Sequence, residues 1–169
     1  MLFRSYFGFP WAILGNPGVD LLVPLLAPLI GLEPAVKLIV CAIPALTVGG
    51  LLWVAREVHG RVPPTALFAL PFAYSFPFLF GFVNFALAMA LAFLAFALWL
   101  RLARLGHFRL RALLFVPIPL VLCICHAFGC GTFRLLCFSV RSVRRHAPAK
   151  GVFPSFVCRV PTHPGHARS

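Results

Sequence analysis

Acidic residues are almost missing from this chain of 169 residues. It contains only three Asp or Glu against fifteen Lys or Arg, and charged residues make up 11% of the whole. A typical soluble domain is about 25% charged and about 45–50% apolar, whereas 62% of this chain is hydrophobic. So little polar surface cannot cover a globule of this size in water. The composition excludes an ordinary soluble domain and predicts a membrane protein.

The chain also lacks the motifs of several enzyme classes. It has no glycine-rich P-loop, no G-x-S-x-G nucleophile elbow and no H-E-x-x-H zinc motif. No internal repeat indicates an inverted-repeat transporter. The net charge of +12 would suit a nucleic-acid-binding protein, but the basic residues flank apolar runs, so we assign the charge to membrane topology and expect no nucleic-acid partner. The six cysteines show no framework spacing, which predicts no structural disulfide.

The longest stretch without charge covers 39 residues, Val62–Leu100. A single helix of that length would measure about 58 Å, against a hydrocarbon core of about 30 Å. The run must therefore fold back. Gly81 and Asn84 mark the turn, because glycine adopts tight-turn angles and asparagine hydrogen-bonds its local backbone. The sequence thus predicts a hairpin of two helices, 63–80 and 83–103.

Two further uncharged runs predict the remaining spans, at about 35–56 and 112–130. Together with the hairpin they make four spans. The segment 1–34 has apolar runs that are too short to cross a bilayer, and we expect it to be interfacial or re-entrant. The sequence therefore predicts an all-α fold, a multi-pass transmembrane helical bundle of about four spans in residues 35–133.

Arginines in the short connections set the expected orientation, with these connections in the cytoplasm and the turn at 81–84 outside. The six arginines are Arg56, Arg61, Arg101, Arg104, Arg109 and Arg111. If the spans alternate, the basic segment 134–169 lies outside, against the rule. This tail has no apolar periodicity and is expected to be disordered or bound to anionic headgroups. Two explanations stay open: a frame-shifted end of a longer protein, or a genuine cytoplasmic tail behind a fourth run that only dips into the bilayer.

The stretch CICHAFGC places four possible metal ligands within eight residues: Cys123, Cys125, His126 and Cys130. Thiolates and imidazoles bind zinc and copper. The spacing, however, matches neither a C-x₂₋₄-C zinc pair nor a haem attachment, and on a helix Cys123 and Cys125 point about 200° apart. We expect packing, with no metal and no cofactor. His126 alone is a functional candidate as an ionisable group within a span, but the glycines after it favour a position near the interface.

Asp20 and Glu33 are the only carboxylates on the side predicted to face outside. An enzyme at the membrane surface needs such groups to bind a metal or to act as a base, so these two are the candidate catalytic residues. A simpler interpretation of Asp20 is a helix N-cap after the turn-like stretch GNPGV. Glu57 is expected in a solvated cytoplasmic loop, and Asn84 is expected to be a turn residue.

Three stretches carry a resemblance to known proteins: GVDLLVPLLAPLIGLEPAVKL, FPFLFGFVNFALAMALAFLAFALWLRL and ICHAFG, together covering about residues 16–130. Their order resembles an uncharacterised group of bacterial polytopic membrane proteins, which look distantly like GT-C type glycosyltransferases that use lipid-linked sugars. That class places an essential acidic residue in its first outer loop, where Asp20 and Glu33 would lie. Its members have many more spans, so the resemblance implies a fragment, located in a bacterial inner membrane.

Three functions are compatible with these features. The first is a fragment of a lipid-linked sugar transferase. The second is a small transporter or channel subunit, for which the spans offer few polar side chains. The third is a membrane scaffold that contacts other membrane subunits, with Gly49 and Gly50 as the contact point. In each case the lipid bilayer is the immediate partner.

Overall fold

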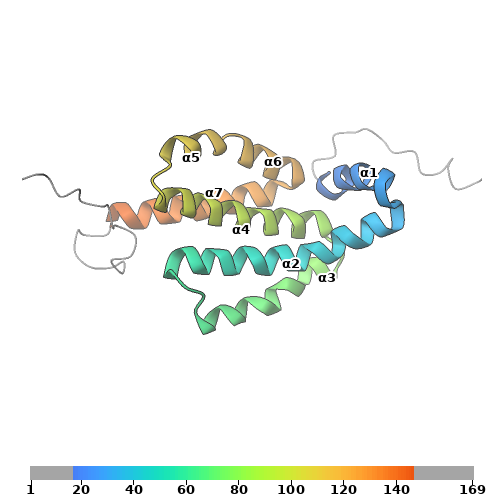
Figure 1. Ribbon diagram of the computed structural model, residues 1–169, viewed down its shortest axis with the longest axis horizontal. Helices are drawn as coiled ribbons and strands as arrows, with labels where there is room; N and C mark the ends of the chain where they lie inside the picture. Colours follow the sequence, from blue (N-terminus) through green and yellow to red (C-terminus); the bar gives the residue numbers. More distant parts are fainter. Residues whose placement is uncertain (1–16, 147–169) are drawn as a thin grey trace, which may run out of the picture.

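The computed structural model describes residues 17–146, which form helices and connecting loops with no strand in that part of the chain. The first half contains α1 (Gly18–Ile30), α2 (Leu32–His59), the 3₁₀ helix η2 (Pro64–Tyr74) and the short α3 (Phe76–Leu79). The second half contains α4 (Val83–Arg104), α5 (Phe108–Leu114), α6 (Pro117–Cys125) and α7 (Ala127–His146). The predicted all-α fold is confirmed (Figure 1).

The three longest helices, α2, α4 and α7, run in the same direction (Figure 1). Between them the chain must return: η2 and α3 connect the end of α2 to the start of α4, and α5 with α6 connects α4 to α7. The first return begins at Gly60, whose left-handed backbone (φ 74°) ends α2 while its N–H bonds to the Arg56 carbonyl oxygen. The fold is therefore a set of parallel helices with shorter, irregular segments between them.

Three segments of the described chain are long and apolar enough to cross a bilayer: Leu32–His59, Val83–Arg104 and Phe108–Cys125. The expected multi-pass membrane fold is thus confirmed. The segment 63–80, expected to be a further span, instead forms η2 and α3, which together are a shorter apolar element. Its prolines account for the difference, because a proline such as Pro71 lacks the N–H that a regular helix would bond to its preceding turn.

The run expected to be one span at 112–130 is interrupted near its end. His126 has an extended backbone (φ −171°, ψ 133°), so α6 ends at Cys125 and α7 begins one residue later. The chain turns back along α4 at this point. Gly129 permits the return, because a Cβ atom there would lie only 2.8 Å from the side chain of Ala88.

The helix α7 also extends into the segment where the sequence predicts a disordered tail. Its residues Cys130, Phe133 and Cys137 are buried, and their helical spacing forms one apolar stripe against α4 and α6. This packing keeps the chain helical past residue 133 in spite of its arginines. The rest of the predicted tail, 147–169, and the first part of the predicted interfacial segment, 1–16, lie outside the described residues.

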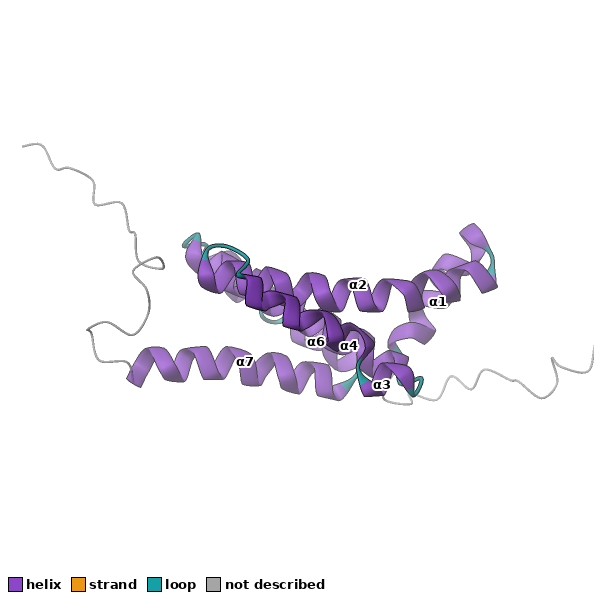
Figure 2. Cartoon of the chain, turned by 90° about the horizontal axis from the view of Figure 1, so that it is seen from below, coloured by secondary structure: helices purple, strands orange, loops and turns teal. Residues whose placement is uncertain are grey.

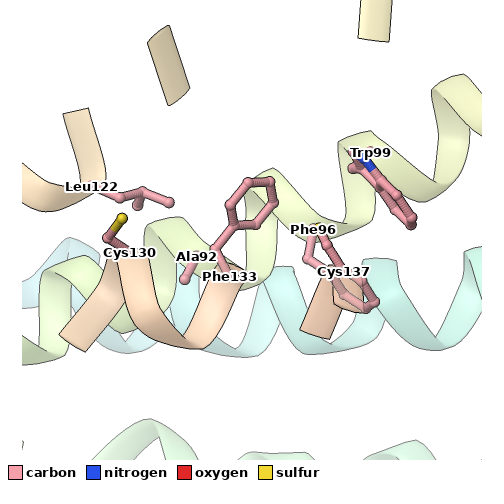
Figure 3. Close-up of a cluster of buried hydrophobic side chains, with 7 residues drawn as sticks. All are labelled: Ala92, Phe96, Trp99, Leu122, Cys130, Phe133 and Cys137. Atoms are coloured by element: carbon pink, nitrogen blue, oxygen red, sulfur yellow. The ribbon is translucent and has the colours of Figure 1, made fainter. Parts of the chain in front are cut away.

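The central helix of the bundle is α4, which packs against α2 on one side and α7 on another. Figure 3 shows the cluster that joins it to α6 and α7, formed by Ala92, Phe96, Trp99, Leu122, Cys130, Phe133 and Cys137. On the α2 side, a Cβ atom on Gly50 would lie 2.9 Å from the Phe93 Cβ, whereas one on Gly49 would meet open space. Of the two glycines proposed as a contact point, Gly50 makes the contact within this chain.

The course of α7 bears on the charge conflict in the sequence-based topology. The conflict arose because the last crossing was expected to end outside. Since α7 runs in the same direction as α4, Arg141 near its end lies at the same end of the bundle as Arg56 and Arg104 (Figure 1). We call this the basic end. The C-terminal ends of the three parallel helices therefore share one basic end of the bundle.

Candidate functional site

Polar side chains gather at the end of the bundle opposite the basic end, where α1 and α4 begin. Asn84 is the second residue of α4. Its Oδ1 accepts a hydrogen bond from the Val19 N–H at 2.6 Å, and its Nδ2 donates to Asp20 Oδ2 at 3.5 Å. The first turn of α1 is therefore capped by a residue 65 positions away.

Two sequence-based expectations are corrected by this arrangement. Asp20 is not an N-cap: Pro17 occupies that position without a side-chain hydrogen bond, and Asp20 lies in the first turn of the helix. A carboxylate there still interacts favourably with the helix dipole. Asn84 is not a turn residue, because its amide joins α1 to α4. Burial of α1 against α4 supplies its capping acceptor from outside the local sequence.

His126 lies at the joint between α6 and α7, beside the same polar group. Its Nδ1 accepts a hydrogen bond from the Phe128 N–H at 3.3 Å, which leaves Nε2 as the ring nitrogen that can donate. The ring also meets Phe85 edge-on, with 5.4 Å between centroids. A cavity of about 180 Å³ is lined by His126 and by Gly81 to Phe85, including Asn84. We call this space the polar cavity.

A larger, apolar groove of about 510 Å³ runs between α2, η2 and α4. It is open because η2 packs chiefly on α2, and because several of its lining residues are alanines. Its walls include Thr47, Leu51, Ala55, Phe68, Ala69, Phe72, Ala73, Ser75, Phe85, Met89 and Phe93. The volume is within the range of about 300–1,000 Å³ that is typical of small-molecule sites. Phe85 lines both this apolar groove and the polar cavity.

Glu33, the other candidate catalytic residue, lies apart from this site. It stands two residues after Gly31, which ends α1, whereas Asp20 is in the first turn of that helix. Its Oε1 forms an ion pair with Lys37 Nζ at 2.6 Å, one helical turn away, and both side chains are largely exposed. The two carboxylates therefore do not converge on one reacting atom.

The four possible metal ligands are separated by the break at His126. Cys123 is exposed, whereas Cys125 and Cys130 are buried, and all three are free thiols. No group of three or more His, Cys, Asp or Glu within residues 17–146 is arranged to hold a metal ion. Cys130 takes part in the apolar cluster of Figure 3.

Glu57 is a residue whose role the sequence did not reveal. It lies in the last turn of α2, and its side chain is only 2% exposed, in contrast to the solvated loop expected for it. Oε1 accepts a hydrogen bond from Trp53 Nε1 at 3.1 Å, and Oε2 is 2.8 Å from Arg104 Nη2 of α4. The i, i+4 spacing of Trp53 and Glu57 is visible in the sequence, but the pairing with Arg104 is not.

Comparison with known proteins adds no relative: no protein-family model, no curated protein and no solved structure matches the chain.

Proposed function

We propose that this multi-pass membrane protein binds an amphiphilic lipid, with the polar group in the polar cavity and a hydrocarbon chain in the apolar groove. The observation that carries the proposal is Phe85, which lines both spaces and so makes them neighbours. A lipid needs such a pair of sites, one able to hydrogen-bond and one apolar. The groove runs beside α2 and α4, two helices that can cross a bilayer, so an acyl or prenyl chain can enter from the membrane.

The side chains of the polar cavity fit a phosphate or sugar head group. Asn84 and His126 both carry N–H donors, and the first turn of α1 lies beside them. The resemblance to proteins that use lipid-linked sugars supports a prenyl-linked head group in a bacterial inner membrane. Asp20 is hydrogen-bonded to Asn84 of the cavity lining, which supports its proposed role as a base beside the head group.

Photo-crosslinking of the full chain in lipid nanodiscs tests this proposal. The probe is a prenyl phosphate with a photoreactive diazirine in its chain, with a diazirine phosphatidylglycerol for comparison. We expect the prenyl phosphate to label the lining residues Phe72 and Phe93 of the groove. Stronger labelling by phosphatidylglycerol would retain a lipid site but contradict the prenyl-linked assignment.

The matched variants are Ala69→Trp, which fills the groove, and Leu67→Trp, which adds the same ring on an exposed position of η2 outside the lining. Loss of several buried CH₂ groups should lower labelling about tenfold in Ala69→Trp. Leu67→Trp should leave it unchanged. His126→Phe keeps the ring contacts but removes the nitrogens, and should weaken prenyl phosphate more than a prenyl alcohol. Equal labelling of the two tryptophan variants would show that the chain does not occupy the groove.

A further inference from the structure

Arg134 is an exposed arginine in the middle part of α7, one helical turn after the buried Cys130 and at the edge of the buried stripe of that helix. Figure 2 shows α7 along the edge of the bundle, away from α2. At 20 residues, α7 has the length of a membrane crossing, but its arginines keep it out of the segments of the described chain that are apolar enough to cross a bilayer, so its depth depends on its packing against α4. The Arg134 guanidinium therefore needs a partner or solvent to stabilise its charge.

The depth of Arg134 follows from the pairing of α7 with α4. Gly129 packs on Ala88, and Thr132 Oγ1 lies 3.5 Å from Met89 Sδ. The two helices advance together, which places Arg134 level with about residues 91–93 of α4. That level is about 15 Å from either end of α4, hence near the middle of a helix that can span the bilayer. An arginine at this depth is unfavourable unless it has a partner.

The Asp and Glu side chains of the chain do not supply that partner, because all three are placed elsewhere. Glu33 pairs with Lys37, and Glu57 pairs with Arg104 at the basic end. Asp20 is hydrogen-bonded to Asn84 at the opposite end. A second copy of the chain in the same orientation offers only the same three side chains, and none of them lies at the level of Arg134.

The residues around Arg134 form a surface on which another helix can pack. Gly131, Arg134, Leu135 and Phe138 follow the i, i+3, i+4, i+7 pattern of one helix face. Leu135 and Phe138 are 67% and 68% exposed, and a Cβ atom on Gly131 would meet nothing within 4 Å. Small residues of this kind let a neighbouring membrane helix approach closely. We call these four residues the α7 outer face.

We propose that the α7 outer face binds a transmembrane helix of a different protein, one that carries an Asp or Glu near the middle of its span. The carboxylate pairs with the Arg134 guanidinium, and the apolar part of that helix packs on Gly131, Leu135 and Phe138. A charged, hydrogen-bonded pair within the bilayer gives the contact its specificity. The inference rests on α7 alone and is independent of lipid binding in the groove.

The test uses the full chain in phosphatidylcholine vesicles and synthetic Leu/Ala transmembrane peptides with a single Asp, Lys or Leu at the centre. Association is measured by energy transfer between labels on chain and peptide. We expect the Asp peptide to bind about tenfold more tightly than the Leu peptide. Arg134→Leu should abolish this preference, and Arg134→Asp should transfer it to the Lys peptide. Arg141→Leu, which removes an exposed arginine of the same helix nearer its end, should leave it unchanged.

Three outcomes would overturn the inference. Equal binding of Asp and Leu peptides would show that Arg134 does not select a carboxylate. An effect of Arg134→Leu that appears only when anionic lipid is added would assign the charge to a lipid phosphate. A loss of energy transfer between two labelled copies of the chain on Arg134→Leu would assign the α7 outer face to self-association.

Discussion

The central helix α4 is packed on two sides by parallel helices, and the two interfaces are built differently. Toward α2, the contact includes the close approach of Gly50 to Phe93 and, at the end of α4, the ion pair between the buried Glu57 and the more exposed Arg104. Toward α7, the contact is an apolar stripe that includes Cys130 and Phe133. Both interfaces have one glycine at the closest approach, Gly50 on α2 and Gly129 on α7.

The two interfaces between parallel helices differ in where their charged side chains lie. The α2–α4 interface turns an acidic and a basic side chain toward each other, so the charge becomes part of the packing. The α4–α7 interface turns only apolar and small residues inward, and Arg134 and Arg141 of α7 are exposed. Charge inside the first interface therefore affects stability, whereas charge outside the second is available for recognition.

The largest expected effect is at the ion pair. Arg104→Met leaves the Glu57 carboxylate buried with only its Trp53 hydrogen bond, and should lower the free energy of unfolding by about 3 kcal/mol. The measurement is unfolding in mixed micelles with increasing dodecyl sulfate. Arg101→Met, an exposed change in the same turn, should have little effect. Adding Glu57→Leu to Arg104→Met should restore most of the stability, and no recovery would mean that the carboxylate is solvated.

A smaller loss is expected where the helices touch most closely. Gly129→Leu places a side chain against Ala88, and Gly50→Leu places one against Phe93, at distances where the helices must separate. Each should cost about 1–3 kcal/mol of unfolding free energy in the same assay. Gly49→Leu is the control, because open space lies beside it. A loss of stability in Gly49→Leu that depends on protein concentration would instead support the scaffold function, with Gly49 at a contact between chains.

The smallest effect is expected at the start of α1. Asn84→Ala removes the acceptor of the Val19 N–H and should lower local stability by about 1 kcal/mol. Amide hydrogen exchange in α1 should rise several-fold, with little change in the centre of α4. Asp20→Asn retains the Val19 bond and should leave exchange nearly unchanged. Equal exchange in Asn84→Ala and the native chain would show that the α1 cap is not formed.

The candidate site illustrates which residues the sequence could identify. Asp20, Asn84 and His126 stand out because polar groups are rare in so apolar a chain. The three residues lie around one end of the bundle. They meet there because η2 with α3, and α5 with α6, lead the chain back to that end, where the starts of α1, α4 and α7 come together. Phe85 gave no signal, because it is one of 19 phenylalanines and matters only through the two spaces that it lines.

The amino-acid sequence by itself determined the all-α class, the turn near Gly81 and the spans that become α2 and α4. These depend on local hydropathy and backbone preference, which neighbouring residues decide. Only the tertiary structure decided that η2 is a 3₁₀ helix and that α7 returns along α4. It also decided that Glu57 meets Arg104 and that Asn84 caps α1, because those hydrogen bonds and ion pairs join residues that are far apart in the chain.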